Sequence, residues 1–118
     1  MSDKYILDDD GNPVPCDDLM IWAVWFEQAS RDRSRVLQQD YAEGSDDTVG
    51  VSTVFLGLDY NYFGDGPPLL WETLVFGTSL DGTGNRYSTR EAALRGHREF
   101  LERVREAYAR EQRGDNSD

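Results

Sequence analysis

The sequence predicts a small α+β fold, an antiparallel β-sheet of three to five strands packed against two α-helices. Two strand-like segments rich in apolar residues occupy the middle of the chain, and helical patterns lie before and after them. A length of 118 residues suffices for one domain with one hydrophobic core. We expect a single domain over residues 1–113 and a disordered C-terminal tail over residues 114–118.

The N-terminal part predicts a short strand at Tyr5–Leu7, a turn at Asp10-Gly11 and a helix from about Leu19 to Arg31. Asp17 stands where the N-cap of this helix is expected. The apolar residues of the helix lie on more than one face, with Leu19, Trp22, Ala23, Phe26 and Ala29 on one side and Ile21 and Trp25 on another. Such a helix is buried on two sides, so we expect a homo-oligomer, most simply a dimer.

The middle of the chain carries the strands. Val36–Tyr41 alternates weakly, which favours a strand over a continued helix. Val49–Leu58, β-branched and aromatic, is the strongest strand candidate, and Leu69–Phe76 is the second. Residues 59–68 form a long loop between these two strands, and residues 79–85 form another loop.

The last element is a helix from Thr89 to about Gln112. Ser88-Thr89-Arg90-Glu91 has the pattern of a capping box, in which the Ser88 hydroxyl accepts a hydrogen bond from the amide of residue 91. The apolar stripe of this helix consists of Ala93, Phe100, Leu101, Val104 and Tyr108. Gly114 is well placed to end it.

Composition and charge exclude several classes of function. A net charge of −11 disfavours direct DNA or RNA binding, which depends on Lys and Arg at the phosphates. The longest apolar run, Leu19–Phe26, is far shorter than the roughly 20 residues that span a bilayer, and no signal peptide precedes it. A lone Cys16 excludes an intrachain disulfide and a cysteine metal cluster. We therefore expect a cytosolic protein that does not bind membranes.

Charge is unevenly distributed along the chain. Residues 36–85 hold no Lys or Arg but eight acids, Asp40, Glu43, Asp46, Asp47, Asp59, Asp65, Glu72 and Asp81. Residues 86–113 hold eight arginines against five glutamates. Ordinary solvated surfaces explain both segments, and an acidic ridge facing a basic helix is the alternative.

No catalytic or metal-binding constellation stands out. His97 is the only histidine, and its position at the edge of the last apolar stripe favours packing over catalysis. Asp8-Asp9-Asp10-Gly11 resembles part of a calcium loop but lacks the downstream Glu. Asp59 ends one strand and Glu72 lies inside the next, so a hairpin could bring the two carboxylates together, but acids are common here and chance placement is the preferred interpretation. We expect a protein that is not an enzyme and uses no metal or cofactor.

Two segments are candidates for binding a ligand. The long loop and the strand after it offer aromatic rings that stack on planar ligands, and the start of the last helix offers free amides and arginines that attract phosphate. In both cases a structural role, capping the sheet or capping the helix, is the alternative. The candidate residues are Tyr60, Asn61, Tyr62, Trp71, Arg86, Ser88, Thr89, Arg90 and His97.

Several segments together resemble a family of small proteins encoded by bacteriophages and prophages. They cover roughly residues 51–104 and are Val51–Asp59, Phe63–Thr73, Val75–Gly77, Arg86–Thr89, Glu91–Ala93 and Gly96-His97. Tyr60-Asn61-Tyr62 departs from the shorter loop of that family. The family has no established activity.

This resemblance implies a phage accessory protein in the host cytoplasm, and such proteins often antagonise host defence. We expect a non-enzymatic protein that binds and sequesters a nucleotide-derived immune signal. An acidic mimic of nucleic acid, or another protein-binding inhibitor of a host defence protein, is the alternative. A small phage enzyme or a regulator of the host is a second alternative.

Overall fold

The structure is a computed structural model that describes residues 3–114. Within this range it contains six strands and two helices, β1 (Tyr5–Leu7), β2 (Pro13–Pro15), α1 (Leu19–Arg31), β3 (Val36–Tyr41), β4 (Gly50–Phe55), β5 (Trp71–Phe76), β6 (Gly84–Tyr87) and α2 (Arg90–Gln112). The predicted α+β class and the strand at Val36–Tyr41 are confirmed. None of the helices in residues 3–114 is long and apolar enough to cross a membrane.

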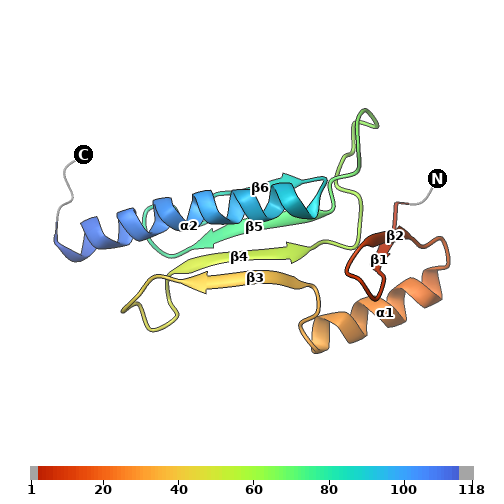
Figure 1. Ribbon diagram of the computed structural model, residues 1–118, viewed down its shortest axis with the longest axis horizontal. Helices are drawn as coiled ribbons and strands as arrows, with labels where there is room; N and C mark the ends of the chain where they lie inside the picture. Colours follow the sequence, from red (N-terminus) through yellow and green to blue (C-terminus); the bar gives the residue numbers. More distant parts are fainter. Residues whose placement is uncertain (1–2, 115–118) are drawn as a thin grey trace.

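Strands β3 to β6 form one antiparallel sheet in which each strand pairs with the next along the chain (Figure 1). Val51 lies opposite Val75, and Phe55 lies opposite Trp71. Because side chains alternate along a strand, these residues share one face, which α2 covers while contacting all four strands. We call the other side the open face, and its side chains include Ser52, Val54, Glu72, Leu74, Phe76 and Arg86.

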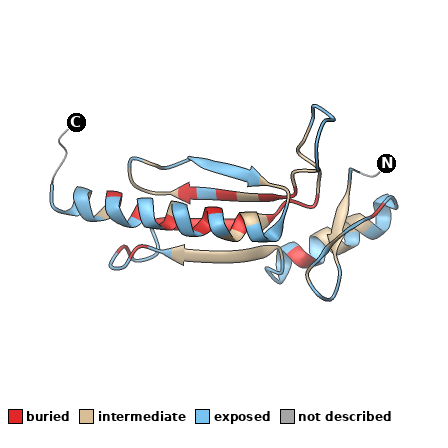
Figure 2. Cartoon of the chain, turned by 45° about the horizontal axis from the view of Figure 1, so that its top comes forward, coloured by how far each residue is buried: buried red, intermediate tan, exposed pale blue. Residues whose placement is uncertain are grey.

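The hydrophobic core lies between α2 and the covered face of the sheet (Figure 2). It consists of two clusters of buried side chains, one made of Ala42, Val49, Val51, Val75, Leu101 and Val104, the other of Phe55, Leu70, Trp71 and Ala93. Burying a large apolar side chain contributes about 1.5–3 kcal/mol. These clusters therefore hold the sheet and α2 together.

The N-terminal part of the chain lies beyond one end of the four-stranded sheet (Figure 1). β1 and β2 pair with each other, and α1 packs against β1. Trp25 meets the Phe55 ring edge-on at 5.8 Å between centroids, and Trp22 Nε1 donates a hydrogen bond to the Gly57 carbonyl at 3.0 Å. Helix α1 thus covers the end of the sheet, and only α2 covers a face.

Helix α1 has the predicted bounds, but its N-cap is Asp18 and not Asp17. The Asp18 carboxylate accepts hydrogen bonds from the amides of Met20 and Ile21, each at 3.0 Å. This geometry satisfies two of the amides that have no partner within the helix. Asp17 remains an exposed charge at the same end of α1.

Helix α2 begins one residue later than predicted, at Arg90 instead of Thr89. Thr89 is the N-cap, and its hydroxyl accepts a hydrogen bond from the amide of Ala92. With Thr89 in this role the third helical residue is Ala92, so no carboxylate at that position reaches back, and the predicted Ser88–Glu91 capping box is wrong. Gly114 follows the helix, and residues 115–118 of the predicted tail lie outside the described residues.

The sequence pattern did not indicate β2 and β6. Pro13 and Pro15 bound β2, and Gly84 and Asn85 begin β6, and all three residue types are depleted in strands. Both elements are short and lie at the edge of their sheets. Pairing with a stronger neighbouring strand, rather than local propensity, therefore determines their conformation.

Candidate functional site

The residues singled out from the sequence lie in three separate places. Arg86 pairs with Glu72 in the sheet register and therefore lies on the open face, while Arg90 begins α2 on the covered side. His97 lies between α2 and the sheet. Arg86 and Arg90 thus belong to opposite sides of the sheet and cannot hold one phosphate together.

The aromatic loop and Arg86 do come together. The Tyr60 and Tyr62 rings lie 5.9 Å apart between centroids, and the Arg86 guanidinium lies 4.5 Å from the Tyr60 centroid. Arg86 Nε donates to a Glu72 carboxylate oxygen at 2.8 Å. Two rings, a guanidinium and a carboxylate therefore form a continuous ladder, which we call the Tyr–Arg–Glu ladder.

A hollow of about 430 Å³ on the open face adjoins this ladder. Apolar walls from Leu69 and Leu74 and polar groups from Glu72 and Arg86 line it. The terminal nitrogens of Arg86 make no hydrogen bond with any residue in the described part of the chain, so they remain available as donors. Small-molecule sites commonly combine apolar walls with a few such polar groups in about 300–1,000 Å³.

The long loop is held in place by its own polar side chains. The Asp59 carboxylate accepts hydrogen bonds from the amides of Asn61 and Leu69 at 2.8 and 3.0 Å. The Asn61 side-chain amide donates to the carbonyls of Asp65 and Pro67. Asn61 is therefore a brace of the loop, while Tyr62, 77% exposed, remains open to solvent.

Trp71 and Arg90 lie away from this ladder. Trp71 is 1% exposed and packs against Phe55 with 5.0 Å between ring centroids, so neither face of its ring is open to a ligand. With Arg90 it lines a smaller cavity of about 230 Å³ beside the β1–β2 turn. Ser88 and Thr89 precede α2, and the Thr89 hydroxyl is occupied as the N-cap.

His97 is fully buried and joins a chain of polar side chains across the covered face. Its Nε2 lies 2.8 Å from an Asp40 carboxylate oxygen, and its Nδ1 lies 2.7 Å from the Thr53 hydroxyl. Thr53 in turn lies 2.6 Å from the Thr73 hydroxyl. Strands β3, β4 and β5 each contribute one residue to this chain, which we call the buried relay.

The buried relay contains an acid, a histidine and a hydroxyl in the order of a catalytic triad. Thr53 and His97 are nevertheless 0% exposed, so a substrate cannot reach the hydroxyl. A satisfied network of this kind fixes the position of α2 on the sheet instead. Among residues 3–114, no three His, Cys, Asp or Glu side chains are grouped to hold a metal ion.

The carboxylates of residues 36–85 serve different purposes. Asp40 belongs to the buried relay, Asp59 braces the loop, Glu72 pairs with Arg86, and Asp81 accepts a hydrogen bond from the Gly77 amide at 2.7 Å. Half of the eight acids are thus turned toward the protein itself. The uninterrupted acidic segment of the sequence is not an uninterrupted acidic surface.

Sequence reasoning missed Glu72 as a partner in a ligand site. Glu72 carried a signal, because it is the charged residue within an otherwise uncharged strand, but its pairing with Arg86 depends on the register of β6.

Comparison with known proteins adds nothing to this geometry: no known family, curated protein or solved structure matches the chain.

Proposed function

We propose that this protein binds a nucleotide-like small molecule on the open face of its sheet and does not alter it chemically. The observation that carries the proposal is the Tyr–Arg–Glu ladder beside a hollow of about 430 Å³. The nucleotide-derived immune signal expected from the phage resemblance belongs to this class of ligand, and sequestration is the role proposed for the binding.

The ladder matches the separate parts of a nucleotide. An exposed tyrosine ring stacks on a base, and each such stack is worth about 1–3 kcal/mol. The free nitrogens of Arg86 suit a phosphate oxygen, since hydrogen bonds to charged groups are worth about 1.5–3 kcal/mol. The Glu72 carboxylate suits the N–H and O–H groups of a base or ribose.

The charge of the site restricts the ligand further. Glu72 balances the charge of Arg86, and residues 36–85 contain no Lys or Arg. A ligand with several phosphate charges would gain little here and would be repelled by a protein of net charge −11. We therefore propose a ligand with few charges, such as a mononucleotide or a cyclic nucleotide.

Thermal-shift and calorimetric titrations test the proposal, because a ligand that binds the native state raises its melting temperature. The probes are adenosine monophosphate, cyclic mono- and dinucleotides and adenosine-diphosphoribose, with adenosine and ribose 5-phosphate as half-ligands. Tyr62→Ala should weaken binding by about tenfold or more, because it removes one stack from an exposed position. Chromatography should recover the ligand intact.

Arg86→Ala tests the role of the guanidinium, and Arg90→Ala is its matched control. Loss of Arg86 should lower the affinity for phosphate-bearing probes by about 10–100-fold. Loss of Arg90, on the other side of the sheet, should leave that affinity unchanged. Equal effects of the two variants, hydrolysis of the ligand, or no shift with any probe would contradict the proposal.

A further inference from the structure

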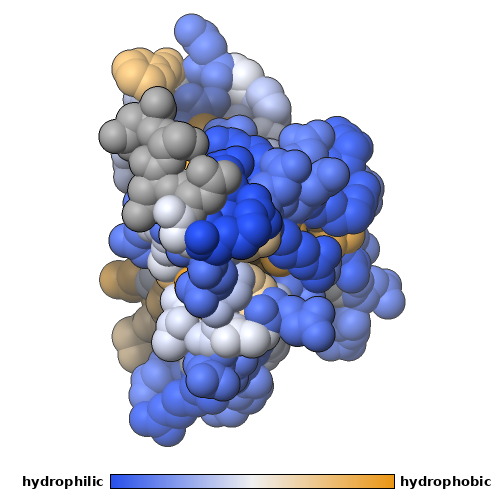
Figure 3. All heavy atoms as spheres, turned by 90° about the vertical axis from the view of Figure 1, so that its left-hand side faces the viewer, coloured by the Kyte–Doolittle hydropathy of each residue, from blue (hydrophilic) through white to orange (hydrophobic). Residues whose placement is uncertain are grey.

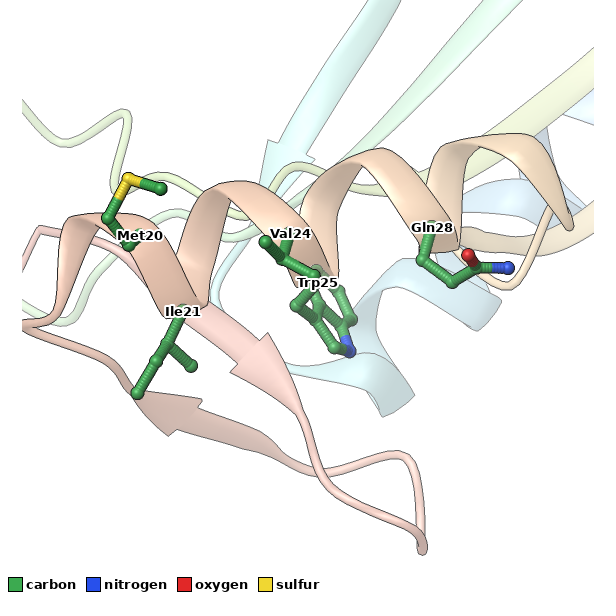
Figure 4. A pocket seen from close by; sticks show the side chains of 5 residues that line it. All are labelled: Met20, Ile21, Val24, Trp25 and Gln28. Atoms are coloured by element: carbon green, nitrogen blue, oxygen red, sulfur yellow. The ribbon is translucent and has the colours of Figure 1, made fainter.

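Helix α1 presents an apolar surface to solvent. Nine large apolar residues are exposed among residues 3–114, and four of them lie in α1, namely Leu19, Met20, Ile21 and Val24. Met20, Ile21, Val24, Trp25 and Gln28 line a shallow hollow of about 600 Å³ along the helix (Figure 4). Scattered apolar residues are ordinary on a surface, but a contiguous group marks an interaction site.

The exposed apolar surface of α1 is not the side of the helix that packs within the chain. Trp22 and Phe26 on the opposite side of α1 stack on each other with 4.9 Å between ring centroids, and Trp22 also reaches Gly57. Ala29 on that side is buried, whereas Met20 is 71% and Val24 64% exposed. The inward side of α1 therefore packs within its own chain, and burial of the outward side requires another molecule.

We infer that a second copy of this chain covers the outward side of α1, and that two α1 helices pack antiparallel in a symmetric dimer. The pattern of charge along α1 supports this occupant. The segment Leu19–Phe26 carries no charge, although 30% of the chain is charged. Two copies of a protein with net charge −11 repel each other over most approaches, and this segment brings no carboxylate to the contact.

The two ends of the outward side carry opposite charges. Asp17 and the N-cap Asp18 lie at the start of α1, and Arg31, whose side chain is 74% exposed and forms an i,i+4 ion pair with Glu27 at 2.7 Å, lies at its end. Val24 and Arg31 are seven residues apart within the helix and therefore lie on one side of it, and Asp17 precedes the N-cap at its start. In an antiparallel pair the acids of each copy approach the arginine of the other, twice by symmetry, which is the self-complementarity that a two-fold dimer requires.

Other occupants fit this surface less well. A lipid surface is bound by helices rich in Lys and Arg, and α1 contains Arg31 as its one basic residue. The opposite end of the molecule, where α2 finishes, is largely hydrophilic (Figure 3). The exposed apolar residues of α1 are thus distinct from the general surface, and a second copy supplies an apolar match together with opposite charges.

Sedimentation equilibrium of the full chain from low to high micromolar concentration tests the inference. The wild type should dimerise, and Val24→Glu should raise the dissociation constant about a hundredfold, because it would bury an unpaired charge at the centre of the contact. Leu74→Glu is the matched control, since Leu74 is an exposed apolar residue of the open face and should leave dimerisation unchanged. Circular dichroism verifies that both variants are folded.

Charge reversal provides a second test that does not depend on Val24. Asp17→Arg and Arg31→Glu should each raise the dissociation constant about tenfold, and the double variant should restore it toward the wild-type value. Asp18 remains the N-cap in all three variants. A wild type that is monomeric at every concentration, a dimer weakened by Leu74→Glu and not by Val24→Glu, or a double variant without recovery would overturn the inference.

Discussion

The unit formed by β3–β6 and α2 and the N-terminal part formed by β1, β2 and α1 use apolar side chains in opposite ways (Figure 2). In the first unit Phe55 and Val104 are fully buried, and His97, Thr53 and Thr73 are joined by hydrogen bonds beneath α2. In the N-terminal part the buried apolar residues are Cys16 and Ala29, while Met20 and Val24 face solvent. The first unit is thus built for stability within one chain, and the second offers its apolar surface outward.

The largest test of this comparison replaces one tryptophan in each unit. Trp71→Ala should lower the free energy of unfolding by about 3–5 kcal/mol, because Trp71 is fully buried in the core under α2. Trp22→Ala should cost clearly less, about 1–2 kcal/mol, because that ring is half-buried and loses one stack and one hydrogen bond. Urea unfolding measures both, and equal losses would contradict the comparison.

The buried relay predicts the next largest effect. Thr53→Val keeps the shape of the side chain but removes the hydroxyl shared by His97 and Thr73, and should cost about 1–3 kcal/mol in the free energy of unfolding. Thr53→Ser keeps the hydroxyl and should restore the hydrogen bonds. A valine variant as stable as the wild type would mean that the relay is not needed to hold α2.

Asp40 gives the same unit a dependence on pH. Burial raises the pKa of Asp40, and hydrogen bonds from Gln38 and His97 lower it by more, so it lies below its ordinary value of 3.8. A lowered pKa contributes stability that is present above the unfolded value and is lost as pH falls through the folded value. Stability should therefore decline below about pH 4, and the decline should be shallower in Asp40→Asn. Thermal melts across acidic pH measure this.

The smallest effect is expected on α1. Met20→Ser at a concentration where the monomer dominates should change the free energy of unfolding by no more than about 0.5 kcal/mol, because Met20 is 71% exposed. A loss comparable to that of Thr53→Val would show that the outward side of α1 is packed within its own chain.

Local patterns in the sequence predicted the elements that carry strong signals. The bounds of α1 and the strands around Val54 and Thr73 follow from alternation, helical periodicity and turn residues. β2 and β6 could not be predicted in this way, because their prolines and glycine oppose strand formation and only pairing overrides them. The N-caps Asp18 and Thr89 each lie one residue after the predicted N-cap. In both cases two adjacent side chains are able to cap the helix, and the sequence does not distinguish them.

The candidate site was predictable only in part. Tyr60, Tyr62 and Arg86 were singled out as residue types, and the structure brings them together. Their proximity depends on the register of β5 with β6, which cannot be read from the sequence. Trp71 and His97 were selected for their chemistry, but the alternation of β5 and the stripe of α2 turn both into the interior.

The buried relay also has a consequence for how the molecule opens. It links Asp40 of β3, Thr53 of β4 and Thr73 of β5 with His97 of α2. Detaching any of these elements breaks the chain, so we expect them to lose their amide protection in a single cooperative event. Helix α1 holds no member of the relay, so we expect it to unfold locally while the rest stays closed. The expected result is two levels of protection against hydrogen exchange, a lower one in α1 and a higher one in the sheet and α2.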